Sequence, residues 1–305
     1  MALPQITSSD VEALIPNCKV VGNSLGGGQK LVFPCSVGGT LYAIKFILLN
    51  NLTDDFDGTI AVKVEAVRAR VEREIKIMQK IDSPFIVKMG AVNLTAATLS
   101  EQSILFYSEE WIDGQDLYQI LQSSSKLTPA EVVKLGTNIV KAISELWNLN
   151  KVHRDIKPQN ITRRACDGSY VLLDLGLAFD LDDKSLTQFG FVPGTKAYFS
   201  PEQLDVINKR DIDFRSDLFS LGIVLYQAIT GMHPFYAYGM SDQELFLRIN
   251  SRPIIAPNTV DPSIPKSLSD IICRLLSKQP SGRYRKCSLL LDEFRKTSVE
   301  LGVES

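Results

Sequence analysis

The sequence has 305 residues, of which 45% are hydrophobic and 22% are charged, and its formal net charge is -2. This composition is typical of a globular protein with enough chain to bury a core, and it excludes global disorder. The charge balance gives no reason to expect nonspecific attraction to nucleic acid or to a membrane surface.

Five cysteines are scattered without a CxxC spacing, and only two histidines are present. We therefore expect reduced thiols, and neither a disulfide framework nor a His-based metal site. The most apolar stretch, Leu218–Ile229, is too short to span a bilayer. Signal-peptide and lipidation motifs are not apparent in this sequence, which predicts a cytoplasmic protein without a membrane anchor.

The first third of the chain has the pattern of strands around one long helix. Residues 1–17 read as a lead-in with one helical turn after Ser8-Ser9-Asp10. Apolar residues recur every three or four positions over Val64–Ile81, which predicts a helix, and Asn50–Thr59 is a polar loop. Strands are expected at Lys19–Val21, Gln29–Phe33, Leu41–Ile47, Ile86–Val92 and Ile104–Tyr107.

Helical patterns dominate the remainder of the chain. The expected helices are Leu117–Leu121, Pro129–Leu149, Arg215–Thr230, Asp242–Ile249 and Leu268–Leu276. This change of pattern predicts an α+β fold with two lobes, residues 1–112 and 113–305, joined near Glu109–Gly114. We expect the tail after Arg285 and the loop Asn50–Thr59 to be solvated surface, with partner binding as the alternative.

One loop concentrates reactive side chains. The stretch Val152-His153-Arg154-Asp155-Ile156-Lys157-Pro158-Gln159-Asn160 contains an acid, a cation and an amide, and a second acid, Asp174, follows an apolar run and precedes Leu175-Gly176. Two carboxylates and an Asn are the groups that metal-assisted phosphoryl transfer requires. With this spacing the chain resembles the eukaryotic-type (Hanks-type) serine/threonine protein kinases over roughly residues 19–285.

The resemblance implies a two-lobed protein kinase-like fold, with a small antiparallel-sheet N-lobe containing one main helix and a larger, mostly helical C-lobe. It implies that Asp155 orients the attacking hydroxyl and that Lys157 offsets charge on the γ-phosphate of ATP. Asn160 and Asp174 would bind Mg²⁺, for which Mn²⁺ is an alternative. Lys157 together with Thr195 is typical of the members of this family that phosphorylate serine or threonine residues of a protein substrate. The resemblance also implies that the kinase can phosphorylate itself.

A lysine on an apolar strand requires a counter-charge, because an unpaired buried ammonium is costly. Lys45 ends the run Tyr42-Ala43-Ile44-Lys45, and the helix that follows supplies Glu74. The resemblance implies that Lys45 holds the α- and β-phosphates of ATP and that Glu74 holds Lys45. Glu72 would take this place if the helix register were shifted.

A glycine-rich stretch precedes this strand without forming a regular GxGxxG motif. Backbone N–H groups approach phosphate closely only where side chains do not intervene. The resemblance implies that Gly26, Gly27 and Gly28 cover the phosphates, and that Val32 and Ala43 lie beside the nucleotide.

The segment between the lobes resembles the one that binds adenine through its backbone. By this alignment the Glu110 carbonyl and the Ile112 amide face the base, and Asp116 accepts the ribose hydroxyls. Glu109 would lie at the rear of the adenine pocket, where a carboxylate is unusual. Either the alignment is shifted by one residue or the pocket has a polar wall.

The stretch from Asp174 to Glu202 resembles the activation segment of the family. Ser185 and Thr187 in its middle are candidate phosphoacceptors, and Arg154 would pair with such a phosphate. The alternative is that both are ordinary solvated hydroxyls.

Three further residues have architectural counterparts in the family. Glu202 and Arg283 match a buried ion pair, and Asp217 matches a carboxylate at a helix start that holds the catalytic loop. His233, in a His-Pro-Phe turn, is then structural.

Two rival functions remain. A pseudokinase that binds nucleotide or a partner is favoured by the irregular glycine loop, and a small-molecule kinase would share the two-lobed fold. The retained Lys45, Asp155, Asn160 and Asp174 argue against the first, and the protein-kinase features of the lower lobe argue against the second. Nothing in the sequence indicates an oligomeric state.

Overall fold

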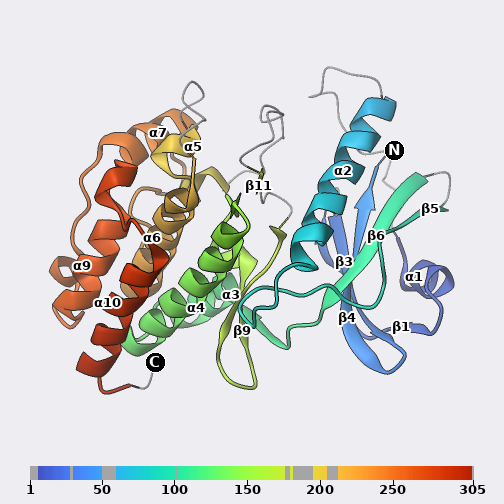
Figure 1. Ribbon diagram of the computed structural model, residues 1–305, viewed down its shortest axis with the longest axis horizontal. Coiled ribbons are helices and arrows are strands. Elements are labelled where there is room, and N and C mark those ends of the chain that lie inside the picture. Colours follow the sequence, from blue (N-terminus) through green and yellow to red (C-terminus); the bar gives the residue numbers. More distant parts are fainter. Residues whose placement is uncertain are drawn as a thin grey trace. The chain divides into compact units, whose positions relative to one another are not determined.

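The computed structural model describes residues 6–27, 30–49, 60–99, 102–175, 179–180, 195–204 and 212–303. The chain divides into two compact units: Met1–Asp82 with Val87–Ile112, and Ser83–Ile86 with Asp113–Ser305. The first unit is an antiparallel sheet with one long helix, and the second is mostly helical (Figure 1). The α+β, kinase-like fold class expected from the sequence is confirmed.

The sheet of the first unit has the strand order β1-β3-β4-β6-β5, with β2 also paired to β3, and all its pairs are antiparallel. Its strands are β1 (Cys18–Val20), β2 (Leu25–Gly27), β3 (Lys30–Val37), β4 (Thr40–Leu48), β5 (Thr95–Leu99) and β6 (Gln102–Glu110). The helices of this unit are α1 (Ser8–Leu14) and α2 (Ile60–Met78). The helix α1 begins at Ser8 and not after Ser8-Ser9-Asp10 as expected, because its N-cap is Thr7, which forms a capping box with Asp10.

Strand β4 separates two environments by the alternation of its side chains. Ile44, Phe46 and Leu48 are buried in an apolar cluster that includes residues of α1. Within this cluster the Phe46 ring stacks on Phe106, with ring centroids 5.3 Å apart. Since neighbouring residues of a strand point to opposite faces, Lys45 is directed to the other face of the sheet.

The helix α2 buries a stripe in which Val71, Glu74, Ile75 and Met78 recur at helical spacing. Glu74 is the carboxylate within this stripe, only 4% exposed. Packing of the stripe therefore forces an acidic side chain into an apolar environment, where a charge is tolerated only with a partner.

The expected strand Ile86–Val92 is wrong. This segment forms only isolated bridges, at Ile86 and at Met89, although the backbone of Gly90 donates a hydrogen bond to the Ser108 carbonyl over 2.8 Å. The strand that pairs with β6 is instead Thr95–Leu99. Its largely exposed Thr and Ala residues lie on a sheet edge and give no alternating apolar pattern.

The second unit is built around α4. Its helices are α3 (Leu117–Ser124), α4 (Pro129–Asn148), α5 (Pro201–Leu204), α6 (Phe214–Thr230), α7 (Asp242–Ser251), α8 (Pro257–Val260), α9 (Lys266–Leu275) and α10 (Cys287–Glu300). Its strands are β7 (Gly114–Asp116), β8 (Lys151–Val152), β9 (Ile161–Arg164), β10 (Tyr170–Leu172) and β11 (Phe179–Asp180), which pair in the order β10-β9-β7 and as β11-β8. The 3-10 turns are η1 (Pro158–Asn160), η3 (Thr195–Tyr198) and η5 (Pro280–Gly282).

The tail after Arg285 is not solvated surface, contrary to the sequence expectation. It forms α10, which packs against α4 (Figure 1). The fully buried Phe294 ring lies against Gly136 of α4, where an added Cβ would meet the ring at 2.4 Å. Leu290, Phe294 and Thr297 recur at helical spacing, but most of the surrounding residues are polar and obscure this stripe.

A buried ion pair joins the start of α5 to the end of η5. The guanidinium of Arg283 donates to both Glu202 carboxylate oxygens, over 2.6 and 3.0 Å. Its remaining N–H groups donate to the carbonyls of Arg215, Ser277 and Lys278, so all five donors are used. Ser216 donates a further hydrogen bond to Glu202. The buried guanidinium is tolerated because each of its N–H groups has a hydrogen-bond acceptor.

His233 has a structural position. Its Nδ1 accepts the N–H groups of Phe235 and Tyr236, over 3.1 and 2.8 Å. Burial lowers the pKa of this imidazole to about 3, so it is neutral under ordinary conditions.

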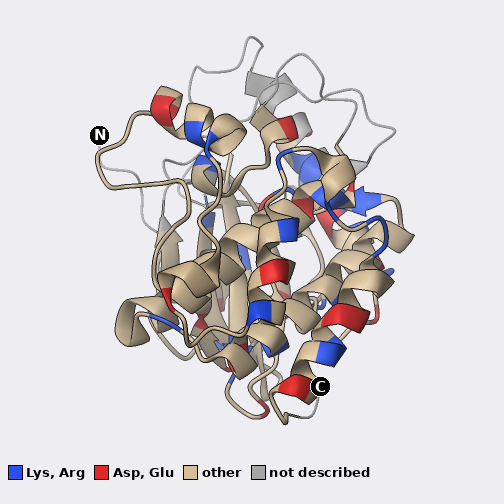
Figure 2. Ribbon diagram, turned by 90° about the vertical axis from the view of Figure 1, so that its left-hand side faces the viewer, with Lys and Arg blue, Asp and Glu red and all other residues tan. Residues whose placement is uncertain are grey.

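Charged side chains are mixed in sign over the second unit. In Figure 2 acidic and basic segments alternate along the foreground helices. Within the described ranges, no helix is long and apolar enough to cross a lipid bilayer.

The ion pair predicts a large stability difference between two similar substitutions. Arg283→Met should lower the free energy of unfolding by about 3–5 kcal/mol, because it strands the buried Glu202 carboxylate. Lys266→Met breaks an exposed pair with Asp270, whose side chains are 76% and 63% exposed, and should cost less than about 1 kcal/mol. Urea unfolding of both variants measures the difference. Equal losses would contradict this assignment.

Candidate active site

The loop after β8 is held by one carboxylate. Asp217, in the first turn of α6, accepts the backbone N–H of His153 and of Arg154, each over 2.8 Å. Arg154 adopts a φ of +68°, a left-handed conformation that non-glycine residues rarely take. Gln203 of α5 donates to the Arg154 carbonyl over 3.0 Å. The backbone around Asp155 is therefore determined from both α5 and α6.

Asp155 is the centre of a polar network inside this loop. Lys157 Nζ donates to its Oδ2 over 2.8 Å, and Asn160 Nδ2 donates to the same oxygen and to the Asp155 carbonyl, each over 2.9 Å. Burial raises the pKa of the Asp155 carboxyl, and the Lys157 ammonium opposes this effect. The acid, the cation and the amide that the sequence placed in one loop thus contact one another.

Asp174 is tied to the same network through its preceding residue. The Leu173 N–H donates to the Asn160 carbonyl over 2.8 Å, and the Leu173 carbonyl lies 3.1 Å from His153 Nε2. Because His153 Nδ1 accepts the Asp155 N–H, Nε2 is the nitrogen that donates. Asp174 itself has a φ of +59°. His153 is a positioning residue that the sequence argument missed, although it lies within the motif.

The donor atoms of this region fit a hard divalent cation. The Asn160 amide nitrogen is bound to Asp155, so its oxygen is the atom that would face a cation. The Asp174 carboxylate is near enough to raise the pKa of Asp155. Among the described residues no group of three or more His, Cys, Asp or Glu side chains forms a metal site. One carboxylate and one amide oxygen suit Mg²⁺, which keeps water and substrate phosphates as its other ligands.

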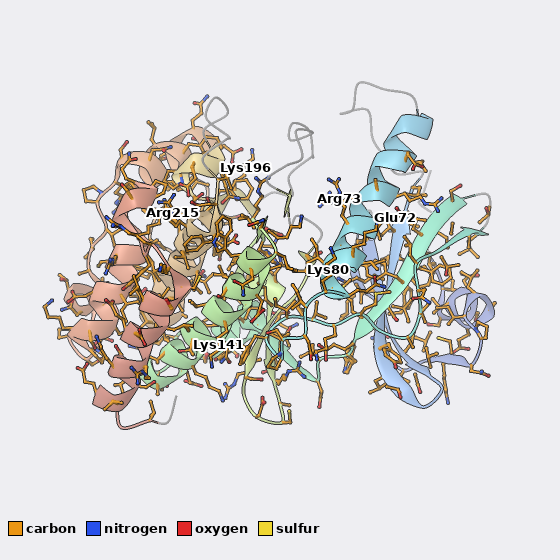
Figure 3. All side chains as sticks on the ribbon, in the orientation of Figure 1. Glu72, Arg73, Lys80, Lys141, Lys196 and Arg215 are labelled. Carbon is orange, nitrogen blue, oxygen red and sulfur yellow. The ribbon has the colours of Figure 1, made fainter. Side chains whose placement is uncertain are left out.

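In the first unit, Lys45 lies between two carboxylates. Its Nζ donates a hydrogen bond to Glu109 Oε1 and lies 3.8 Å from Glu74 Oε1. The expected contact with Glu74 is therefore present. Glu72, the alternative partner, is labelled on α2 in Figure 3. Its side chain is 41% exposed and pairs with Arg68 over 3.1 Å.

The glycine-rich stretch forms the β2–β3 hairpin. Gly26 has a φ of +93°, and a Cβ there would lie 2.7 Å from the Lys30 carbonyl, so only glycine fits. Gly27 pairs with Lys30, and Gly28 lies outside the described residues. Val32 stands directly opposite Lys45, as expected for a residue on the same face of the sheet.

The residues expected to bind adenine and ribose have these positions. Ala43 and Glu109 are paired across β4 and β6, and Glu110 N–H donates to the Lys88 carbonyl over 2.9 Å. Ile112 is the last residue of the first unit. The Asp116 Oδ1 accepts the Gln119 N–H over 2.7 Å, so this carboxylate caps α3.

Ser185 and Thr187 lie outside the described residues. After that gap, Lys196 of η3 pairs with Asp242 of α7 over 2.7 Å, and Ser220 donates to the Tyr198 carbonyl over 2.7 Å. Figure 3 labels Lys196 in this region. Burial lowers the pKa of the Arg154 guanidinium to about 10, which leaves it positively charged at neutral pH.

Comparison with known proteins agrees with this geometry. A model of the protein kinase domain matches residues 21–294. The chain is 27% identical over 292 residues to a probable serine/threonine-protein kinase of Clostridium perfringens, covering 93% of this chain and 40% of that protein. It is 33% identical over 246 residues to serine/threonine-protein kinase pkn3 of Myxococcus xanthus, covering 77% and 43%. It is 30% identical over 237 residues to serine/threonine-protein kinase PknH of Mycobacterium bovis, covering 74% and 37%.

These matches define the class of protein. The chain belongs to the protein kinase domain family. It spans about two fifths of the length of these curated relatives.

The role of Asp217 can be measured with two Asp→Asn changes at the start of α6. Asp217→Asn replaces one acceptor oxygen by a donor facing a backbone N–H, and should lower the free energy of unfolding by about 1–3 kcal/mol. Asp213→Asn keeps a good N-cap residue on the same helix and should cost less. Hydrogen exchange of the His153 and Arg154 amides should accelerate only in the first variant. Unchanged exchange there would contradict the assignment.

Proposed function

We propose that this chain is an ATP- and Mg²⁺-dependent protein kinase that phosphorylates serine or threonine hydroxyls of a protein substrate, and that it phosphorylates itself. The observation that carries the proposal is the network of Asp155, Lys157 and Asn160, with Asp174 joined to it through Leu173. The names of the relatives, all serine/threonine-protein kinases, support the choice of acceptor.

In this proposal each group of the second unit has one task. Asp155 orients the acceptor hydroxyl and takes its proton, and its raised pKa brings it closer to neutral pH. Lys157, already bonded to Asp155, would neutralise charge on the transferred phosphoryl group. Asn160 and Asp174 would hold Mg²⁺, which supplies charge neutralisation at the β- and γ-phosphates.

The first unit would supply the nucleotide contacts. Lys45 would bind the α- and β-phosphates, with Glu74 orienting its ammonium, and the hairpin at Gly26 and Gly27 would cover the phosphates. Catalysis then depends mainly on positioning the reactants and on stabilising the charge of the transferred phosphoryl group. A cytoplasmic location and a protein partner bearing a Ser or Thr acceptor belong to the same proposal.

Loss of the proposed base tests the activity directly. Asp155→Asn should lower autophosphorylation about 10²–10⁴-fold, and Asp174→Ala should lower it at least as far, because the metal ligand is lost. Asp167→Asn changes an exposed carboxylate in the turn between β9 and β10 and should retain wild-type activity. The readout is phosphate incorporation with mass-spectrometric site mapping. Full activity of both active-site variants would refute the kinase proposal.

We also propose that phosphorylation of Ser185 or Thr187 activates the enzyme, with Arg154 receiving the phosphate. The double change Ser185→Ala and Thr187→Ala should lower activity toward an added protein substrate and abolish any stimulation by preincubation with ATP. The rate before and after preincubation is the measurement. Wild-type rates in the double variant would show that both residues are ordinary loop hydroxyls.

A further inference from the structure

The position of Glu109 follows from the register of the sheet. Lys45 is paired with Tyr107 across β4 and β6, and Ala43 is paired with Glu109. Glu109 is therefore the diagonal neighbour of Lys45 on the same face, within reach of a long side chain. The Lys45 ammonium donates a hydrogen bond to this carboxylate, while Glu74 Oε1 is 3.8 Å away and has no hydrogen-bond partner among the described residues.

The cluster of Lys45, Glu74 and Glu109 has an unbalanced charge. All three side chains are buried, with exposed fractions of 7%, 4% and 4%. One ammonium and two ionised carboxylates carry a net charge of about -1, and such a buried excess charge is costly. Binding a proton removes the imbalance without moving the backbone.

The groups around Glu109 favour its neutral form. Burial is the largest effect that raises the pKa of the Glu109 carboxyl, and the Glu74 carboxylate raises it further. The ammonium groups of Lys45 and, more weakly, Lys30 of β3 oppose these effects. Tyr107 is a further titratable neighbour among the described residues of this face, with its ring centroid 5.8 Å from Lys45 Nζ.

We propose that Glu109 competes with nucleotide phosphates for the Lys45 ammonium, so that removing its negative charge, by protonation or by substitution, strengthens nucleotide binding. The inference rests on the proposed function, in which Lys45 binds the phosphates. With Glu109 ionised, a phosphate approaches a cluster of net charge about -1. With Glu109 protonated, the same cluster is neutral, and the ammonium is shared between Glu74 and the phosphate.

Two consequences distinguish this role from a purely structural one. Nucleotide binding draws Lys45 away from Glu109, which raises the pKa of Glu109 further, so binding takes up a proton from solvent. Affinity for nucleotide therefore rises as the pH falls toward the raised pKa of this carboxyl. Glu109 would therefore affect nucleotide binding through Lys45, without touching the nucleotide itself.

The test compares Mg²⁺–ADP binding by wild type, Glu109→Gln and Glu72→Gln, using titration calorimetry between pH 6 and about 8.5. Glu109→Gln keeps the shape and removes the charge, and at the upper pH it should bind about tenfold more tightly than wild type. Its affinity should also vary less with pH. Glu72→Gln removes one carboxylate from the exposed side of α2 and should behave as wild type.

Proton uptake is measured by repeating the titration in buffers of different ionisation enthalpy. Wild type should take up more protons than Glu109→Gln, and the nucleotide's own titration cancels in this difference. If Glu109→Gln is poorly folded in thermal denaturation, Glu109→Met removes the same charge and serves in its place. Equal affinity and equal uptake in wild type and charge-free variant, or weaker binding by the variant, would overturn the inference.

The kinase proposal and this inference fail in different ways. Absence of both Mg²⁺–ADP binding and phosphotransfer in wild type would remove the kinase proposal. Normal binding and phosphotransfer in wild type, with no gain in the Glu109 variants, would remove only the competition.

Discussion

The active-site loop depends on the carboxylate of Asp217. A left-handed conformation at Arg154 costs on the order of 1–3 kcal/mol. Each hydrogen bond from a backbone N–H to this charged group contributes about 1.5–3 kcal/mol, and Asp217 accepts two of them, from His153 and Arg154. The two bonds together outweigh the strain, so the loop keeps the conformation that directs Asp155 toward Lys157 and Asn160.

A comparable constraint operates in the first unit through strand alternation. Ile44 and Phe46 are held in the apolar cluster with α1, so Lys45 must point to the opposite face, where α2 brings Glu74. The same sheet register delivers Glu109. The lysine is therefore positioned by apolar packing on the other side of its own strand, and its ammonium lies near carboxylates from two different elements.

Sequence patterns predicted the long elements well, and they placed together the loop residues that the structure joins by hydrogen bonds. The helix patterns of α4 and α6 and the alternation along β4 each lie in a continuous stretch, and so does the set Asp155, Lys157 and Asn160. Local pattern failed where pairing is decided by a distant partner. Thr95–Leu99 became a strand because β6 offered it an edge, and Ile86–Val92 did not pair although its composition is more apolar.

Local pattern also failed for the tail after Arg285. The composition of α10 is largely polar, and its packing becomes evident only from the burial of Phe294 against Gly136. The sequence by itself determined the fold class and, through the spacing of its motifs, the family, because both can be recognised from patterns along the chain. Only the tertiary structure decided that Glu109 shares the Lys45 ammonium with Glu74, since residues 64 positions apart meet only when the chain has folded.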